Sequence, residues 1–175
     1  MAIFQLTGLS GAGKTTLATK SIELLQSNGI DAELIDGDIY RKTICKDLGF
    51  SKEDRIENIY RLGKIAKEKD NKHKVIIIAA INPYNEAREN LAKFYNAKII
   101  WINCSIDMLI RRDTKGLYKR AVLPDQHPEK ISLLTGVNDV FEKPQHAHLI
   151  INTDVDAIEV SAKKMYHFIV DNIKL

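Results

Sequence analysis

The sequence predicts a three-layer α/β fold in which helices flank a five-stranded parallel sheet. Strand-like and helix-like runs alternate along the 175 residues, which is the pattern of βαβ units. Residues 75–81 are apolar without polar alternation, as expected of a strand that is covered on both faces. A glycine-rich turn joins the first strand to the first helix. At this length we expect a single domain over residues 1–175.

In the N-terminal half, each element is predicted from its own local pattern. Apolar runs predict strands at residues 3–6, 32–35 and 75–81. A helix over residues 14–25 follows the glycine-rich turn, and Asn28-Gly29 closes it as a C-cap pair. A short helix is expected over residues 40–48. Ser51 and Asp54 have the spacing of a capping box, so a long helix should run to about residue 69.

In the C-terminal half, a helix is expected over residues 87–94, and strands at residues 98–103 and 149–151. Ser105 is the expected cap of a helix that ends near residue 112. Residues 113–140 have charged and proline interruptions and no clear period, so we expect a lid or loop there. The run Thr-Asp-Val-Asp at residues 153–156 should cap the final helix, which runs to about residue 173.

The turn after the first strand reads Gly8-Leu9-Ser10-Gly11-Ala12-Gly13-Lys14-Thr15, the G-x-x-x-x-G-K-T pattern of a phosphate-binding P-loop. Its glycines let backbone N–H groups turn inward and cradle phosphate oxygens. The helix that follows directs its positive dipole end at the same place. Lys14 adds a point charge for the β- and γ-phosphates, and Thr15 offers a hydroxyl to Mg²⁺.

The overall composition is that of a soluble globular protein, with 45% hydrophobic and 28% charged residues. The net charge of +3 is too small to indicate a nucleic-acid partner. No apolar run has the length of a membrane span, and no signal peptide fits before the first strand, so we expect a cytoplasmic protein. Cys45 and Cys104 match no metal-binding spacing and are expected to be reduced thiols.

Polar residues that can take part in catalysis or binding follow the second expected strand, at the sheet edge where parallel α/β proteins bind ligands. Asp36 and Asp38 are expected either to hold Mg²⁺ or take a proton from an acceptor, or to form an Asp-Gly turn with a helix cap at Asp38. Arg41 and Arg55 are candidates for a phosphate or sulfate group, with solvated surface arginines as the alternative. Phe50 would stack on a base or belong to the core. The histidines at positions 127, 146 and 148 are expected at the surface rather than around a metal.

A more specific pattern is distributed over seven segments. These are residues 8–16, Asp36-Gly37-Asp38 with Arg41, Asp47-Leu48-Gly49-Phe50-Ser51, Asp54-Arg55 with Glu57-Asn58 and Arg61, Ile81-Asn82-Pro83-Tyr84, Arg112-Asp113 with Lys115-Gly116-Leu117-Tyr118-Lys119, and Thr135-Gly136. In these segments the chain resembles adenylylsulfate kinase (APS kinase), a P-loop kinase family, and the resemblance extends over nearly its whole length.

The resemblance implies an ATP-dependent kinase that phosphorylates the 3′-hydroxyl of adenosine 5′-phosphosulfate (APS) with Mg²⁺, as part of sulfate assimilation, and that forms homodimers. The expected ATP-binding residues are Gly8, Ser10, Gly11, Ala12, Gly13, Lys14, Thr15 and Thr16. The expected acceptor-binding residues are Asp38, Arg41, Phe50, Arg55, Asn58, Ile81, Asn82, Lys115, Leu134 and Thr135. Lys14, Asp36 and Asp38 are the expected catalytic residues, and Thr15 and Asp36 the expected metal ligands. Phe50 would stack on the adenine, and Lys115 would lie in the lid.

The chain departs from the family pattern on the acceptor side. Ile39 stands where the family usually has asparagine, and Asn82 replaces the serine of the family's Ile-Ser-Pro. The link between Lys119 and Leu134 is about six residues longer than usual, within the tolerance of loops. Leu134 replaces the phenylalanine that forms the second face of the adenine sandwich, which should weaken stacking by roughly 0.5–1.5 kcal/mol.

Three alternatives to an APS kinase follow from these observations. A kinase of the same family acting on another activated nucleotide, such as a cytidine diphosphate conjugate, is favoured by the altered lid. A nucleotide-binding module without catalysis is less favoured, because Lys14, Asp38 and Arg55 are all present, and because Asn71-Lys72-His73-Lys74 lacks the aspartate of a guanine-reading motif. A nucleic-acid binder is not supported, since the sequence has neither a basic stripe nor an aromatic platform.

Overall fold

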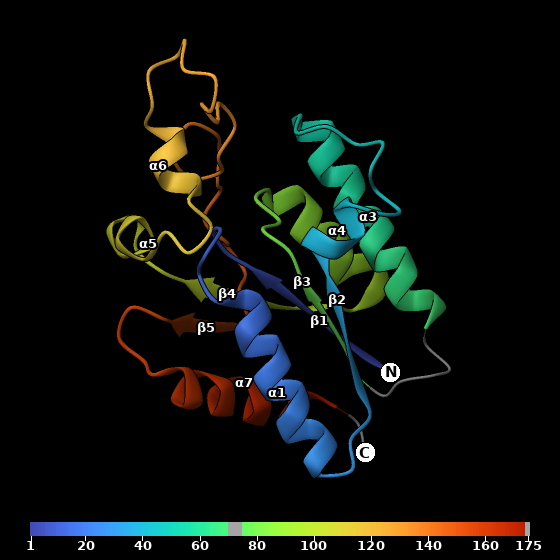
Figure 1. Ribbon diagram of the computed structural model, residues 1–175. Helices are drawn as coiled ribbons and strands as arrows, with labels where there is room; N and C mark the ends of the chain where they lie inside the picture. Colours follow the sequence, from blue (N-terminus) through green and yellow to red (C-terminus); the bar gives the residue numbers. More distant parts are fainter. Residues whose placement is uncertain (70–74, 174–175) are drawn as a thin grey trace.

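The computed structural model describes residues 1–69 and 75–173, and it has the predicted architecture (Figure 1). Its sheet has five strands in the order β2-β3-β1-β4-β5, and every neighbouring pair is parallel. The strands are β1 (Ala2–Thr7), β2 (Ala32–Asp36), β3 (Val75–Ala79), β4 (Lys98–Asn103) and β5 (Leu149–Asn152). The prediction of a five-stranded parallel sheet is therefore confirmed. The segment Asn71-Lys72-His73-Lys74, which was weighed as a guanine-reading motif, lies outside the described residues.

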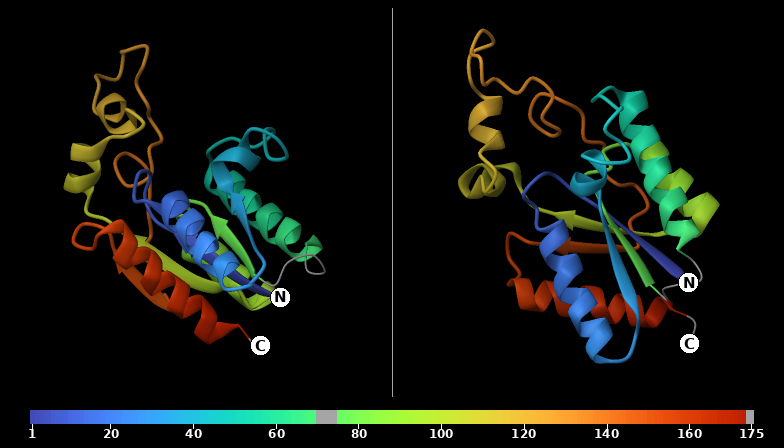
Figure 2. Two further views of the ribbon diagram at one scale, coloured as in Figure 1. Left: turned by 60° about the horizontal axis from the view of Figure 1, so that its bottom comes forward. Right: turned by 45° about the vertical axis from the view of Figure 1, so that its right-hand side comes forward.

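Helices cover both faces of the sheet, as Figure 2 shows. Helices α1 and α7 pack together on one face, and α3 and α4 pack together on the other. The helices are α1 (Lys14–Ser27), α2 (Gly37–Arg41), α3 (Lys52–Glu68), α4 (Asn85–Tyr95), α5 (Ile106–Arg112), α6 (Leu117–Ala121) and α7 (Ile158–Asn172). The loops at the carboxyl ends of the strands all lie at one edge of this sandwich, where the P-loop also lies.

The apolar run of β3 is explained by these two covering layers. Val75, Ile77 and Ala79 belong to the core cluster beneath α1 and α7. Ile76 and Ile78 belong to the cluster beneath α3 and α4. Because successive side chains of a strand point to opposite faces, a strand buried on both faces needs apolar residues at every position.

Two helix starts differ from the sequence-based expectation. The short helix expected over residues 40–48 is wrong: α2 begins at Gly37 and ends at Arg41. Its cap is Asp36 rather than Asp38, because the Asp36 carboxylate accepts the Asp38 N–H at 2.8 Å. The carboxylate at the end of β2 satisfies the first turn of α2 and so starts the helix earlier.

The expected cap of the final helix is also wrong. Helix α7 begins after Ala157, which supplies no side-chain cap. The polar run before it is used elsewhere: the Asp154 carboxylate accepts the Ser105 N–H at 3.0 Å, and the Thr153 hydroxyl donates to Ala12 O at 3.1 Å. These long-range contacts tie the β5–α7 loop to β4 and the P-loop. The caps expected at Ser51 and Ser105 are confirmed, since their hydroxyls accept from Asp54 N and Met108 N.

The segment of residues 113–140 projects from the carboxyl edge of the sheet (Figure 1). It contains one short helix, α6, between loops. Cys45 and Cys104 are both buried free thiols, as expected. Among the helices of the described residues, none is long and apolar enough to cross a membrane.

Candidate active site

The glycine-rich turn has the backbone of a phosphate-binding loop between β1 and α1. Gly11 and Gly13 have φ values of +77° and +99°, in the left-handed region that favours glycine. At Gly8 a Cβ would collide with the carbonyl oxygen of Ile102 in β4. Glycine is therefore required both for the turn and for its close approach to the neighbouring strand.

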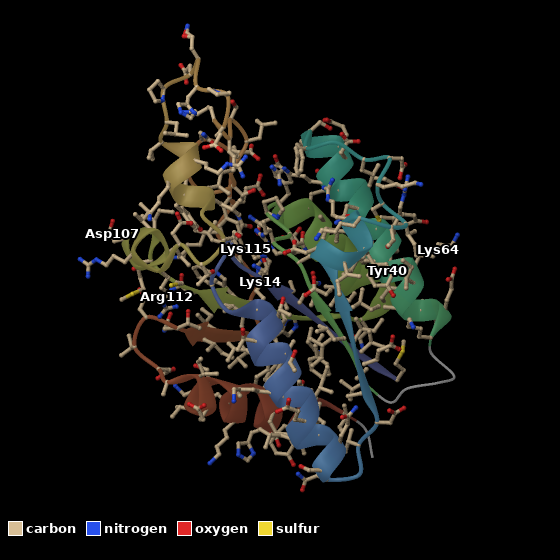
Figure 3. The ribbon with its side chains drawn as sticks, viewed as in Figure 1. Lys14, Tyr40, Lys64, Asp107, Arg112 and Lys115 are labelled. Carbon is tan, nitrogen blue, oxygen red and sulfur yellow. The ribbon has the colours of Figure 1, made fainter. Side chains whose placement is uncertain are left out.

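Lys14 is folded back over this loop. Its ammonium donates to Gly8 O at 2.9 Å and to Leu9 O at 2.8 Å. Burial lowers the pKa of Lys14 to about 8, and the nearby charges of Asp38 and Asp36 only partly oppose this. Figure 3 shows Lys14, at the start of α1, close to Lys115, which comes from the 113–140 segment. An anionic ligand in the loop would restore the charge that burial disfavours.

Thr15 and Asp36 form a pair of oxygen donors next to the loop. The Thr15 hydroxyl donates to one oxygen of the Asp36 carboxylate at 2.7 Å, and the other oxygen caps α2. Hydroxyl and carboxylate oxygens are the ligands that Mg²⁺ prefers, and it usually takes only one or two from the protein when it binds with phosphates. No cluster of three or more acidic, histidine or cysteine ligands occurs in residues 1–69 and 75–173. The donor pair thus fits a metal that is held mainly by a phosphate ligand.

A cavity of about 810 Å³ opens beside the P-loop, between α2, α3, the segment after β3 and the 113–140 segment. All ten residues expected to bind an acceptor line it: Asp38, Arg41, Phe50, Arg55, Asn58, Ile81, Asn82, Lys115, Leu134 and Thr135. Ser10 is the P-loop residue that reaches its wall. The cavity is large enough for a nucleotide-sized ligand.

An ion pair joins two of the residues that line this cavity. The Lys115 ammonium donates to the Asp38 carboxylate at 2.6 Å. Desolvation acts to raise the pKa of Asp38, but the hydrogen bond and charge of Lys115, together with the charge of Lys14, outweigh it and hold this pKa below its ordinary value. Asp38 is therefore a carboxylate at neutral pH and can accept a hydrogen bond from a hydroxyl.

Arg55 and Phe50 form the wall next to α3. Phe50 is 57% exposed, which excludes the interpretation as a core aromatic. The guanidinium groups of Arg41 and Arg55 lie 5.1 and 5.4 Å from its ring centre. Arg55 is buried rather than solvated, and it donates to the Asp139 carboxylate at 2.6 Å, to Leu133 O and to Phe50 O. Arg55 thus joins α3 to the 113–140 segment in addition to lining the cavity.

Three buried polar side chains of the cavity have atoms without a hydrogen-bond partner. They are Asn58 Oδ1, Asn82 Oδ1 and Thr135 Oγ1, on residues that are 5%, 3% and 1% exposed. Leaving such atoms unpaired is unfavourable, so they indicate a site that a polar ligand completes. Asn58 reaches this wall because it lies one helical turn after Arg55 on the same face of α3.

Residues 130–133 also line the cavity, and sequence reasoning missed them. Lys130 donates to Leu123 O, which closes the elongated link into a loop of its own. Asp139, the partner of Arg55, was missed as well. Asp139 acquires its role from a contact with Arg55, which lies 84 residues away, so no local pattern marks it.

The histidines have local roles or remain exposed. His148 Nδ1 accepts the Ile99 N–H at 3.1 Å, and His127 Nδ1 accepts the Glu129 N–H at 3.2 Å. His146 is exposed. All three side chains are exposed, as expected of surface histidines.

Comparison with known proteins identifies the family. The family model described as adenylylsulphate kinase matches residues 1–152. The chain belongs to the adenylylsulphate kinase family.

Relatives within this family cover most of the chain. The adenylyl-sulfate kinase of Picosynechococcus sp. is 39% identical over 160 residues, which are 91% of this chain and 88% of that protein. The adenylyl-sulfate kinase of Chloroflexus aurantiacus is 40% identical over 150 residues, covering 85% and 78%. The structure of the Mycobacterium tuberculosis APS kinase in complex with AMPPNP and APS superposes with a TM-score of 0.85 at 28% identity, covering 97% of this chain and 98% of that one. The chain is thus a member of a kinase family with a P-loop fold.

Proposed function

We propose that this adenylylsulphate kinase family member transfers the γ-phosphoryl group of ATP to the 3′-hydroxyl of APS, giving 3′-phosphoadenosine 5′-phosphosulfate. The observation that carries the proposal is the position of the cavity. It adjoins the P-loop, and all ten residues that the family resemblance assigns to the acceptor line it. Phosphoryl transfer requires charge neutralisation and alignment of the two substrates, and this arrangement supplies both.

On the donor side, the P-loop backbone and Lys14 hold the phosphates of ATP. The Lys14 ammonium exchanges its two carbonyl acceptors in the loop for phosphate oxygens. Thr15 and Asp36 would hold Mg²⁺, which neutralises charge on the phosphates when it is bound with ATP. The 2.7 Å contact between these two side chains brings their oxygens together for this role.

On the acceptor side, Asp38 orients the 3′-hydroxyl and accepts its proton. Of the two aspartates, Asp38 lines the cavity, whereas Asp36 is engaged by Thr15 and by the first turn of α2. This division favours Asp38 over Asp36 as the base. Lys115 must leave Asp38 when the hydroxyl binds, and it then remains close to the transferring charge.

Phe50, Arg41 and the unpaired polar atoms recognise the acceptor nucleotide. The exposed ring of Phe50 offers a stacking surface for a base. The Arg41 fork is suited to the phosphosulfate. The amide and hydroxyl oxygens of Asn58 and Thr135 accept hydrogen bonds from the ligand and so gain the partners that they lack.

The same site allows a second candidate function, the phosphorylation of a cytidine diphosphate conjugate. It is favoured by Leu134, which is buried in the cavity wall and offers no aromatic face. ADP release measured with APS, AMP and a cytidine diphosphate conjugate separates the two. The proposal expects APS to give the highest kcat/KM. Turnover of the cytidine conjugate without turnover of APS would replace the first function by the second.

Replacing Leu134 by phenylalanine should tighten APS binding. A second ring facing Phe50 adds roughly 0.5–1.5 kcal/mol of stacking, which corresponds to a decrease of about 2- to 12-fold in the KM for APS. The KM for ATP should not change. Val122→Phe is the matched control, because it adds a ring at an exposed position of the same segment that does not line the cavity. An unchanged KM for APS in Leu134→Phe would show that residue 134 does not face the base.

The 113–140 segment is proposed to act as a lid that closes over both nucleotides. Its contacts with the rest of the site include the Lys115–Asp38 ion pair with α2 and the Asp139–Arg55 ion pair with α3. Proteolytic cleavage within residues 119–133 should therefore slow when AMPPNP and APS are both present. Equal cleavage rates with and without the ligands would contradict the lid.

The proposal also includes the cytoplasm as the compartment of the protein and a homodimer as its assembly. Both are carried by the family resemblance. The whole chain, residues 1–175, is proposed to act as one kinase domain.

A further inference from the structure

The lid segment contacts the P-loop through a side chain that the proposed mechanism does not use. Tyr118, in the first turn of α6, is 3% exposed, and its hydroxyl donates to the carbonyl oxygen of Ser10 at 2.7 Å. The two residues are 108 positions apart in the sequence. The contact therefore depends on the fold and not on local structure.

The position of Tyr118 is itself fixed. The Asp113 carboxylate accepts the N–H groups of Tyr118 and Lys119, each at 3.0 Å, and so anchors the start of α6. The ring is part of the core cluster that also contains Ala12 and Leu109. A buried ring and an anchored backbone leave the hydroxyl with one direction to point, which is toward Ser10.

Ser10 O belongs to the same peptide group as Gly11 N–H. In a planar trans peptide the carbonyl and the N–H point in opposite directions. A hydrogen bond that holds Ser10 O on the side of α6 therefore directs Gly11 N–H away from α6. Gly11 has a φ of +77°, so this peptide lies in the turn of the phosphate-binding loop. No hydrogen-bond acceptor for Gly11 N–H is found among the described residues.

We propose that Tyr118 is a positioning residue for the nucleotide: its hydroxyl fixes the Ser10–Gly11 peptide so that Gly11 N–H is available to a phosphate of ATP. This role of Tyr118 rests on the proposed function in one respect, which is that the P-loop binds ATP. An N–H that is already oriented in the free protein binds a phosphate oxygen without the cost of ordering. The hydrogen bond at the carbonyl also polarises the peptide and makes its N–H a better donor.

Two further observations support this role. Burial raises the pKa of Tyr118 to about 12, so the hydroxyl carries its proton throughout the neutral range and is always a donor. Lys115, in the turn just before α6, pairs with Asp38 on the acceptor side. Residues 115–118 therefore contact both the P-loop and the acceptor side of the site.

The experiment compares Tyr118→Phe with the wild-type protein. Phenylalanine keeps the buried ring and removes only the hydroxyl. Binding of AMPPNP with Mg²⁺ is measured by calorimetry without any acceptor, and KM values for ATP and APS are measured separately. We expect the Kd of AMPPNP and the KM for ATP to rise about three- to ten-fold, which is the range of one hydrogen bond, while the KM for APS stays constant. Tyr166→Phe, on α7, is the control and should change none of these values.

Melting temperatures measured with and without AMPPNP separate a positioning role of Tyr118 from a purely structural one. For each variant, the increase in melting temperature caused by saturating AMPPNP is measured relative to the same variant without ligand. A general loss of stability therefore cancels. A smaller increase in Tyr118→Phe than in the wild type supports the proposal. An unchanged Kd for AMPPNP with a lowered melting temperature would overturn it and leave Tyr118 as a core contact. If Tyr118→Phe weakens AMPPNP binding but the wild-type protein does not phosphorylate APS, the proposed function is contradicted and the role of Tyr118 is not.

Discussion

Replacing Lys14 by alanine should lower kcat/KM at least ~10²-fold, the scale of losing one charge that stabilises a transition state. Lys14 is folded over the P-loop, and it donates to two backbone carbonyls of the loop that binding would release. The loss should appear in ADP release with APS as acceptor. Lys20→Ala is the matched control, because Lys20 lies on the same helix but has a partly exposed side chain that pairs with Glu159 of α7. Near-normal turnover in Lys14→Ala would contradict the donor site.

The pH dependence of nucleotide binding gives a second readout of Lys14. Its pKa is lowered to about 8 in the free protein, so the ammonium is charged below this pH and loses its proton above it. The affinity for AMPPNP should therefore fall as the pH rises above about 8, since the neutral amine attracts phosphate less. This fall should be absent in Lys14→Ala, which has no group to titrate.

Replacing Asp38 by asparagine should lower kcat by ~10²–10⁴-fold if Asp38 accepts the proton of the acceptor hydroxyl. The amide keeps the size of the side chain and can still contact Lys115, but it cannot take a proton. The KM for ATP should change little. Asp156→Asn is the control, because Asp156 pairs with Lys164 on α7, away from the cavity. A large rise in the KM for ATP with a normal kcat would make Asp38 a binding residue instead.

The strands and most helices could be predicted because their causes are local. The two-sided burial of β3 requires a continuous apolar run, and Ser51 and Ser105 cap their helices with their own side chains. The two misplaced helix starts have non-local or shared causes. Asp36 serves both Thr15 and α2, and Asp154 is directed to Ser105, which is 49 residues away. A carboxylate with two competing partners cannot be assigned from spacing alone.

In the candidate site, too, the local motifs could be predicted and the long-range contacts could not. The P-loop is a contiguous motif, and the family resemblance marks the acceptor residues that the structure then brings to one cavity. The ion pair of Arg55 with Asp139 spans 84 residues, and the bond of Tyr118 with Ser10 spans 108. Such contacts depend on how the 113–140 segment packs against the sheet edge. That packing has no periodic signal in the sequence, so neither contact could be predicted from it.

We propose that the group phosphorylated in this cavity is the 3′-hydroxyl of APS. The most direct measurement is mass spectrometry of the products formed from ATP with APS, and with a 3′-deoxy analogue of APS. We expect APS to gain one phosphoryl group in an amount equal to the ADP released, and the 3′-deoxy analogue to gain none. ADP release without any phosphorylated APS, or phosphorylation of the 3′-deoxy analogue, would contradict the account.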